Sequence, residues 1–306
     1  MTSDRKKDEF IPYLDEFLFD GQFAGLIEAE MIIRHYLDIM ERRKVKPVLA
    51  GTGSDKFFCT LRPLEWDSEQ LGRRVVRVDY ISTNCHRPEQ FCLFDSILAG
   101  FELAYLRLSQ RHPLASLIQN DSRGFRAYAD KIMLRLSIDP DLDSTDVPHV
   151  RGYNELEIPE KEAQLARIAG ESFSINRFSR DKHFPTDFND RVYRSWVSRC
   201  LNGDQNVLCS IRRNRVQGFI VVSDTIGTPL ERFACGFVEL VAVDRSAKRR
   251  SVGTELLQKA AATLLEKNIQ ILHANTDSQN DEAIRFFKAA GFKQFNSIRE
   301  YHWWRA

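Results

Sequence analysis

One short stretch late in the sequence combines residue types that bind anions. VAVDRSAKRRSVGTELLQKA, Val241 to Ala260, begins as an apolar run, continues as a basic cluster and ends in a helical pattern. The first N–H groups of a helix have no intrahelical partner, and the helix dipole places partial positive charge there. A phosphate group can therefore bind at this turn, where Lys248, Arg249 and Arg250 add charge and Gly253 permits close approach to the backbone.

The same stretch also fits a plainer interpretation, in which a basic loop exposes its charges to water and Gly253 is needed only for packing. The turn has neither the GxxxxGK[ST] spacing of ATP-binding loops nor the GxGxxG spacing of dinucleotide-binding turns. ATP and NAD are therefore poorly supported as ligands. The rest of the chain must decide between the two interpretations.

The composition is that of a globular protein. The chain has 306 residues, of which 43% are hydrophobic and 28% charged, and this length indicates two domains of ordinary size. The net charge of +1 gives no reason to expect nucleic acid or an anionic membrane as partner. The charged N-terminal stretch MTSDRKKDEF predicts no signal peptide, and no apolar run approaches about 18 residues. The six cysteines form no CxxC pair, which argues against a metal site and fits reduced thiols in the cytoplasm.

Hydrophobic periodicity predicts alternating helices and strands. In the first half we expect helices at 17–43 and 93–112, two short strands around a turn at DSEQLG, and a strand after SRGF. The Asp- and Pro-rich segment 139–150 is predicted as a linker. The elements expected after it are a strand at NELEI, helices at 159–173 and 191–201, strands on both sides of Asn214, a buried central strand at ACGFVELVAVD, a helix at 254–267, a strand at IQILHANTD, a helix ended by Gly291, and a terminal strand.

The segments VELVAVDRSAKRRSVGTELL and NTDSQNDEAIRFFKAAGF together resemble two signature segments of the GNAT family of acyl-CoA N-acyltransferases. The family pattern at the turn is Gln or Arg, two residues, Gly, one residue, then Gly or Ala. Lys248 takes the first place, Ser251 that of the first glycine and Gly253 that of the second, and Arg249 stands where glycine is common.

This resemblance implies an α/β (α+β) fold, the GNAT fold, in which helices flank a central mixed, mostly antiparallel sheet. We expect the GNAT acyltransferase domain at 151–306. A smaller, partial GNAT-like α/β domain is expected before it at 58–145, and a helical extension at 1–57.

The resemblance further implies acetyl-CoA (coenzyme A) as the cofactor. In the family, backbone N–H groups of the turn bind the pyrophosphate, the preceding strand pairs with the pantetheine arm, and an Asn at the start of the later helix contacts that arm. The residues assigned to the coenzyme in this way are Leu240, Val241, Ala242, Val243, Lys248, Arg249, Arg250, Ser251, Val252, Gly253, Thr254, Asn280 and Phe287.

The segment ESFSINRFSRDKHFPTDFNDRVYRSWVSRCLNG and the shorter EWDSEQLG are similar to segments of dTDP-amino-sugar acetyltransferases, such as dTDP-fucosamine acetyltransferase. The similarity implies a nucleotide-linked amino sugar as acceptor, with Arg177, Phe178 and Asp181 in a mobile loop over it. Arg177 would offer its fork to a phosphate or sugar oxygen. The alternative is a surface loop with an internal ion pair. Tyr193 and Trp196, three apart on a helix, favour core packing.

Attack of an amine on a thioester needs a neutral amine, a donor for the developing oxyanion and often an acid for the leaving thiolate. The resemblance assigns the carbonyl-polarising N–H to Val241. Glu239 on the same strand is the candidate base, and an outward-facing, salt-bridged Glu is the alternative. The acid is usually a Tyr in the segment that reads FFKAAGF here. Phe287 takes its place and cannot donate a proton.

Three interpretations of Phe287 stay open. The thiolate leaves unprotonated or through water, since acid help is worth about 10²–10⁴-fold and its loss slows the step without forbidding it. Another group serves as the acid, for which Ser278, Tyr301 and His302 are nearest in sequence and Tyr301 is carried forward. Or the chain binds acyl-CoA without turnover. The acceptor alternatives to a nucleotide-linked amino sugar are another small amine or a peptide N-terminus, and the sequence also leaves a homodimer open.

Overall fold

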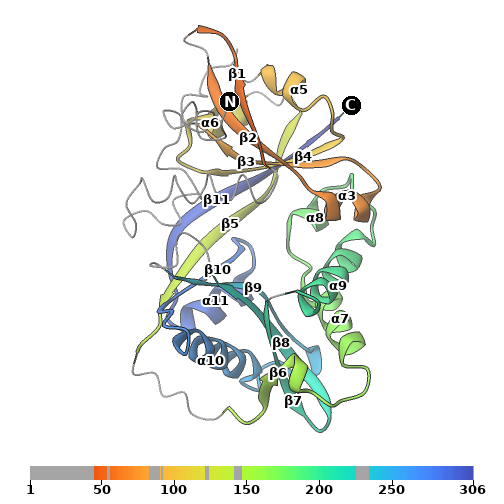
Figure 1. Ribbon diagram of the computed structural model, residues 1–306, viewed down its shortest axis with the longest axis vertical. Coiled ribbons are helices and arrows are strands. Elements are labelled where there is room, and N and C mark those ends of the chain that lie inside the picture. The colour runs from red at the N-terminus through yellow and green to blue at the C-terminus, as the bar shows by residue number, and fades with distance from the viewer. Residues whose placement is uncertain are drawn as a thin grey trace, which may run out of the picture. The chain divides into compact units, whose positions relative to one another are not determined.

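The computed structural model describes residues 45–305 except 54–55, 83–89, 91, 121–123, 141–146, 204 and 225–233. The helix predicted at 17–43, and with it most of the extension predicted at 1–57, lies outside the described residues. The chain divides into two compact units (Figure 1). Unit 1 takes the described residues up to Ile132 and those from Asn296 onward, and unit 2 takes Met133–Ile226 and Ala234–Phe295.

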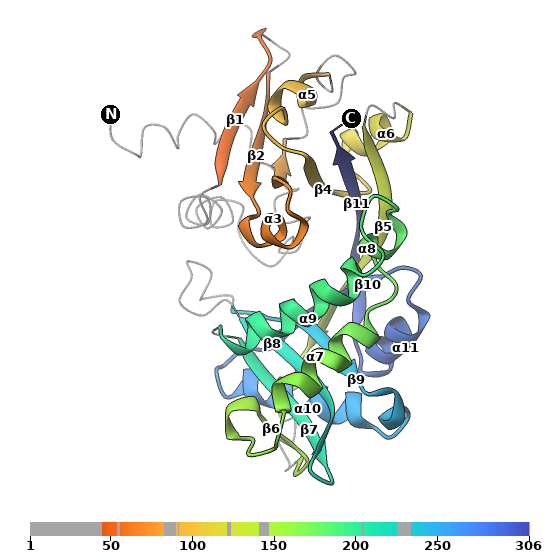
Figure 2. The same ribbon diagram turned by 90° about the vertical axis from the view of Figure 1, so that its right-hand side faces the viewer.

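Unit 1 is built on a mixed sheet. Its strands lie in the order β1 (Lys46–Ala50), β2 (Phe57–Pro63), β3 (Val75–Ile81), β4 (Leu103–Ser109), β11 (Lys293–Trp304) and β5 (Phe125–Ser137). β3 and β4 pair in parallel, whereas β1 with β2, β2 with β3 and β4 with β11 pair antiparallel. The helices of this unit are α3 (Glu65–Leu71), α5 (Leu93–Ile97) and α6 (Pro113–Asn120) (Figure 2).

Aromatic side chains form the core of unit 1. The ring of Phe94 contacts Phe57 and Phe125, with centroid distances of 5.6 and 5.7 Å. Tyr301 and Trp303 of β11 belong to the same buried cluster. The C-terminal strand is therefore part of the core of unit 1, although the segment before it belongs to unit 2.

The prediction of one helix at 93–112 was wrong. The structure has α5 followed by the strand β4, which is buried along nearly its whole length. A strand buried on both faces shows no alternation, and a short apolar run of this kind cannot be distinguished from a buried helix by periodicity.

Two shorter predictions also need correction. The turn expected at DSEQLG is the helix α3, which ends at Gly72 in the left-handed conformation with a φ of 64°. The strand expected at NELEI is a 3-10 turn at Tyr153–Glu155, and the short strand β6 (Val150–Gly152) precedes it. The NELEI segment is short enough for local hydrogen bonds to override its strand propensity.

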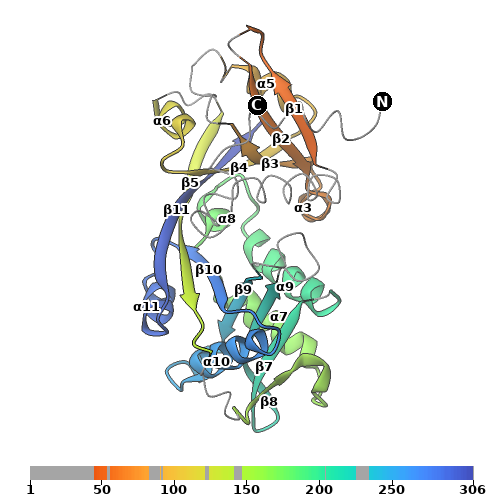
Figure 3. The same cartoon turned by 60° about the vertical axis from the view of Figure 1, so that its left-hand side comes forward.

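Unit 2 contains a second mixed sheet region, with strands in the order β5, β10 (Ile271–Asp277), β9 (Gly236–Val243), β8 (Arg215–Asp224), β7 (Asn206–Arg212) and β6. Its helices are α7 (Lys161–Ser172), α8 (Arg177–Arg180), α9 (Phe188–Leu201), α10 (Val252–Leu265) and α11 (Asp281–Ala289). α10 packs on β7, β8 and β9, and α7 packs on β8 and β9 from the other face of the sheet (Figure 3). α9 packs against α7. The prediction that β9 is central is confirmed.

Some features of the described ranges bear on the class of protein. No helix in these ranges combines the length and apolarity needed to cross a bilayer. In the same ranges, no three His, Cys, Asp or Glu side chains gather to hold a metal ion. Burial raises the pKa of Cys209 to about 12 and that of Cys200 to about 11. Both side chains therefore stay protonated at neutral pH and behave as small core residues.

Candidate active site

The parallel strands β9 and β10 separate soon after they pair. Two Cα pairs join them, Gly236 with Leu272 and Phe237 with His273, and no further pair follows along either strand, both of which are described in full. These pairs stand at the N-terminal ends, so the strands lie apart toward their C-terminal ends. The facing backbone N–H and C=O groups beyond this point are outside the ladder and need other partners.

A bulge in β9 stands at the point of separation. Along the ladder with β8, Val222 pairs with Val238 and Val221 pairs with Leu240, so Glu239 is the extra residue. A bulge bends its strand and increases the local twist. The residues of β9 after Glu239 are thereby turned away from the direction in which β9 first paired with β10.

The turn after β9 is held by Asp244. Its Oδ1 accepts hydrogen bonds from the backbone N–H of Ser246 at 2.9 Å and from the hydroxyl of the same residue at 2.6 Å. Its other carboxylate oxygen contacts the guanidinium of Arg167 on α7. Burial raises the pKa of Asp244, but the hydrogen bonds from Ser246 and Arg167 outweigh it and hold the pKa at about 2. The carboxylate is ionised at neutral pH and ties the turn to α7.

Two residues of this turn adopt the left-handed conformation. Arg249 and Ser251 both have a φ of 62°, which costs a residue other than glycine about 1–2 kcal/mol. Ser251 is the N-cap of α10, and its side chain makes no capping hydrogen bond. The first N–H groups of α10 thus lack this cap at a helix end that carries partial positive charge.

Cationic side chains surround the start of α10. Lys248, Arg249 and Arg250 are exposed, and Nζ of Lys248 lies 2.9 and 2.8 Å from the two carboxylate oxygens of Glu282. The start of α11 is different, because the side chain of Asn280 caps it by accepting a backbone hydrogen bond at 3.1 Å. Of the two helix starts, that of α10 is the one suited to bind an anion.

The segment between α7 and α9 is well packed in this structure. Asn176 caps α8 by accepting hydrogen bonds from the N–H groups of Phe178 at 2.8 Å and Ser179 at 3.2 Å. The buried carboxylate of Asp181 accepts a hydrogen bond from the N–H of His183 at 3.0 Å and lies 2.8 Å from its Nδ1. Of the side chains predicted to lie over an acceptor, Phe178 and Asp181 are buried and Arg177 is half-buried.

Aromatic contacts add to this packing. The ring of Phe178 meets Phe184 and Phe188 edge-on, with centroids 5.3 and 5.4 Å apart. On α9 the ring of Tyr193 stacks on Trp196 at 5.8 Å, which confirms the packing role that their spacing favours. The α8 segment, residues 174–187 between α7 and α9, therefore packs on α9 through its own side chains.

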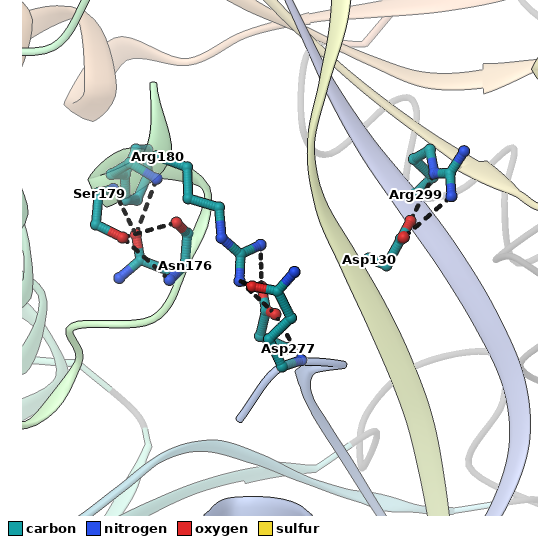
Figure 4. A network of polar contacts seen from close by, with 8 residues as sticks. Asp130, Asn176, Ser179, Arg180, Asp277 and Arg299 are labelled. Carbon is teal, nitrogen blue, oxygen red and sulfur yellow. Dashed lines mark hydrogen bonds and ion pairs between the residues drawn. The ribbon is translucent and has the colours of Figure 1, made fainter. Parts of the chain in front are cut away.

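Arg180 ties the α8 segment to the end of β10. Its Nη1 donates to Oδ2 of Asp277 at 2.9 Å and its Nη2 donates to Oδ1 at 2.7 Å (Figure 4). Nη2 also donates to Oε1 of Gln279 at 3.0 Å. Asp277 is only 1% exposed, so this two-pronged pair is largely removed from water and fixes the orientation of both groups. The segment is held at the end where β9 and β10 are apart.

Residues 166–292 match the family model of the acetyltransferase (GNAT) family. This part of the chain is a GNAT acetyltransferase domain. The match includes the separated strands β9 and β10, the turn between β9 and α10, the C-terminal part of α7 and the whole of α11. The chain is accordingly an acyltransferase, and enzymes of this family use acetyl-CoA as the acyl donor.

The chain is also similar to individual proteins over most of its length. The chain is 24% identical over 247 residues to the spore coat polysaccharide biosynthesis protein SpsD of Bacillus subtilis (strain 168), covering 78% of this chain and 81% of that protein. A tandem GNAT protein from the clavulanic acid biosynthesis pathway is similar with a TM-score of 0.59 at 12% identity, over 98% of this chain and 95% of that one. A GCN5-related N-acetyltransferase from Sphaerobacter thermophilus gives 0.57 at 12% identity, over 96% and 90%.

A third solved structure is the glucosamine N-acetyltransferase region of a fungal multi-domain GH3 β-N-acetylglucosaminidase. Its TM-score is 0.61 at 14% identity, over 99% of this chain and 37% of that one. At these levels of identity the three structures show the fold alone, and the GNAT fold expected from the sequence is confirmed.

The glycine pattern of the GNAT turn has a physical explanation in this chain. Arg249 and Ser251 stand where glycine is common in the family, and both adopt the left-handed conformation that glycine adopts without cost. Gly253 does not have a positive φ, and a Cβ added there would lie 3.1 Å from Cε2 of Phe286. Gly253 therefore has a packing function, since it lets α10 approach α11.

The predicted reactive groups on β9 lie at and just beyond the bulge. Glu239 is exposed, and its Oε1 accepts a hydrogen bond from the hydroxyl of Ser223 at 2.6 Å. Val241 follows in the separated part of β9 and is paired with Ile220 on the β8 side. The roles of Glu239 as base and of the Val241 N–H as carbonyl donor stay predictions, which this arrangement accommodates.

The two predicted positions for an acid differ in surroundings. Phe287 is 3% exposed and packs on Phe286 and Phe292, with centroids 5.0 and 5.1 Å away. Tyr301 is 1% exposed in the core of unit 1, where burial raises its pKa against the opposing effect of Arg299. Arg299 is itself paired with Asp130, at 2.6 Å (Figure 4). Packing accounts for Tyr301, and its role as an acid stays a prediction.

The sequence analysis did not single out Arg180, Asp277 or His273. Arg180 and Asp277 are 97 residues apart, and no local spacing connects them. A His and an Asp within an otherwise buried strand were the available signal, because polar side chains are rarely buried without a structural or functional reason.

Replacing Ser251 by glycine should stabilise the protein. The change removes the strain of a serine in the left-handed conformation, and the greater entropy of glycine in the unfolded chain offsets part of this gain. We expect the free energy of unfolding, measured in urea, to rise by about 0.5–1 kcal/mol. Coenzyme A affinity should not fall, since the backbone N–H is kept. The control is Ser278→Gly at an exposed residue without positive φ, which should lose stability. Equal losses in both variants would contradict the assigned strain.

The Arg180–Asp277 pair should show strong energetic coupling. Arg180→Ala leaves a buried carboxylate without its main partner and should lower the free energy of unfolding by about 2–3 kcal/mol. Adding Asp277→Asn should restore at least half of the loss, because the buried charge is then removed. The control is the exposed pair Arg194–Asp190, where Arg194→Ala should cost about 0.5 kcal/mol or less. Additive losses from Arg180 and Asp277 would disprove the coupling.

Proposed function

We propose that this chain is an acetyl-CoA-dependent N-acetyltransferase that acetylates the amino group of a nucleotide-linked amino sugar. The observation that carries the coenzyme half of the proposal is the separation of β9 from β10 at the Glu239 bulge, just before the cationic start of α10. Strand edges outside a ladder can pair with the amides of an extended ligand, and a helix start can bind its phosphates.

The residues present fit coenzyme A. The N–H groups of 251–254 and the side chains of Arg249 and Arg250 would hold the pyrophosphate, and the main chain of Leu240–Val243 would hold the pantetheine arm. With its phosphates at the start of α10, the arm extends back along β9 toward Glu239. When bound, acetyl-CoA supplies an activated acyl carbon to an attacking amine.

The side chains and backbone of β9 would then carry out the reaction steps. The N–H of Val241 would donate to the carbonyl oxygen as negative charge develops on it. Glu239 would accept the proton of the attacking amine, with the Ser223 hydroxyl fixing its orientation through the 2.6 Å hydrogen bond. Phe287 supplies no acid, so sulfur would leave as a thiolate protonated by water, at a cost in rate but without a change of route.

Several observations support a sugar nucleotide as the acceptor. The Bacillus relative is named for polysaccharide biosynthesis, and a region with the same fold is named a glucosamine N-acetyltransferase. The α8 segment resembles its counterpart in dTDP-amino-sugar acetyltransferases and is held at the open end of β10 by Arg180. Arg177, whose guanidinium lies 4.7 Å from the ring centroid of Phe178, provides a fork for a nucleotide phosphate.

Reversing charge at the α10 turn should weaken coenzyme binding. The double change Arg249→Glu and Arg250→Glu should lower coenzyme A affinity at least about tenfold, because each arginine would donate charge-assisted hydrogen bonds to phosphate. The affinity is measured by titration calorimetry. Arg126→Glu, at an exposed residue of unit 1, is the matched charge reversal and should bind coenzyme A as the wild type does. If the double variant binds coenzyme A as tightly as the wild type does, the phosphates do not bind at this turn.

A panel of amines should identify the acceptor. The assay measures the thiol that is released from acetyl-CoA. A dTDP-linked amino sugar should have a higher kcat/KM than free glucosamine, lysine or a peptide N-terminus. Arg177→Gln should lower kcat/KM about tenfold for the nucleotide sugar through the lost phosphate contact, and should leave free glucosamine unchanged. Preference for lysine or the peptide would refute the sugar assignment. Absence of release with every amine, despite coenzyme A binding, would indicate a binding protein.

A further inference from the structure

His273 occupies the last rung before β9 and β10 separate. Its imidazole stacks on the ring of Phe237, the residue paired with it across the two strands, with centroids 5.5 Å apart. Phe295 meets the imidazole edge-on at 5.4 Å, and the guanidinium of Arg135 on β5 lies over the Phe295 ring at 4.5 Å. The ring is 2% exposed and is held between two aromatic side chains.

Neither nitrogen of this imidazole has a hydrogen-bond partner among the described residues. Burial, followed by the charge of Arg135, lowers the pKa of His273 to about 4, so the ring is neutral at pH 7. A neutral imidazole carries one N–H donor and one acceptor nitrogen. Burying both without partners is unfavourable, and the described residues supply none, so a ligand group would satisfy them.

The position of His273 indicates which ligand group reaches it. In the proposed function, on which this inference rests, coenzyme A binds with its phosphates at the start of α10 and its arm along Leu240–Val243. The reactive end of the arm then lies between Val241, whose N–H is the predicted carbonyl donor, and the bulge residue Glu239, which is two residues from Phe237 and its partner His273. The group that ends there is the acyl thioester, whose carbonyl oxygen is a hydrogen-bond acceptor.

We propose that His273 is a catalytic residue whose N–H donates a hydrogen bond to the carbonyl oxygen of the bound acyl thioester. It acts beside the backbone N–H of β9 and gives the developing oxyanion a second donor. A donor that is already buried and fixed between two rings needs no reorientation as charge develops, and low surrounding polarity strengthens its effect.

The electron and proton balance assigns His273 no proton transfer. The amine nitrogen forms a bond to the carbonyl carbon, and the C=O π pair moves onto oxygen while the His273 N–H donates to it. The pair returns as the C–S bond breaks, and sulfur leaves with its electrons as a thiolate. The proton of the amine goes to Glu239. His273 remains neutral throughout, which its lowered pKa favours.

A purely structural His273 predicts a different outcome from a catalytic one. Replacement by phenylalanine keeps a flat ring between Phe237 and Phe295 and removes the two unsatisfied nitrogens, so Tm should rise in either case. Only the catalytic role predicts that the bound thioester carbonyl also loses a hydrogen bond. The decisive measurement is therefore made on the ligand and does not require turnover.

The experiment uses the full chain with acetyl-CoA labelled with ¹³C at its carbonyl carbon. Infrared difference spectra compare the bound C=O stretch in the wild type, His273→Phe and His273→Gln, and calorimetry measures the affinities for acetyl-CoA and coenzyme A. We expect His273→Phe to raise the C=O frequency and to weaken acetyl-CoA relative to coenzyme A by about fivefold, the effect of one neutral hydrogen bond. The kcat with an accepted amine should fall about 10²-fold. His273→Gln, which keeps a donor, should lie between the two.

Phe295→Leu is the matched control, since it disturbs the same ring packing but keeps the imidazole, and its C=O frequency should match the wild type. An unchanged frequency in His273→Phe, with acetyl-CoA bound normally, would overturn the inference. If His273→Phe does not fold, ¹⁵N-histidine spectra of the wild type decide. One imidazole N–H should shift with acetyl-CoA but not with coenzyme A, and no such shift would overturn it. If the wild type binds neither acetyl-CoA nor coenzyme A, the proposal that this chain binds coenzyme A is itself refuted.

Discussion

The early end of pairing between β9 and β10 is the constraint on which the rest of the site depends. Two rungs hold the strands together, and the bulge at Glu239 then turns β9 away. Continuous pairing would satisfy the backbone of both strands and leave no room for an extended ligand between them. The bulge gives up that pairing, so main-chain groups of β9 become available next to the start of α10.

The elements around the opening hold it in one geometry. Asp244 anchors the turn to α7 through Arg167, and Arg180 anchors the α8 segment to Asp277 at the end of β10. The turn itself places Arg249 and Ser251 in a conformation that suits glycine better. The local cost is accepted where backbone N–H groups must point outward, which is the usual situation at ligand-binding turns.

Buried polar groups near the opening divide into two kinds. Asp277 is buried but satisfied, because the fork of Arg180 and the backbone N–H of Gln279 donate hydrogen bonds to its carboxylate. His273 is buried and unsatisfied within the described residues. The first arrangement stabilises the fold and orients a segment, whereas the second stabilises nothing without a further partner. This difference is why Asp277 is interpreted as a positioning group and His273 as a group that meets ligand.

The sequence by itself determined the order of most elements of unit 2, the basic turn before α10 and the absence of a tyrosine at Phe287. Periodicity and local turn chemistry act over a few residues, so they are visible in the letters. They failed at β4, because a strand buried on both faces has no alternation to distinguish it from a helix. Only the tertiary structure decided the bulge at Glu239, the Arg180–Asp277 pair and the burial of His273. Each arises when segments far apart in the chain pack together, and no local pattern encodes which distant group will become a neighbour.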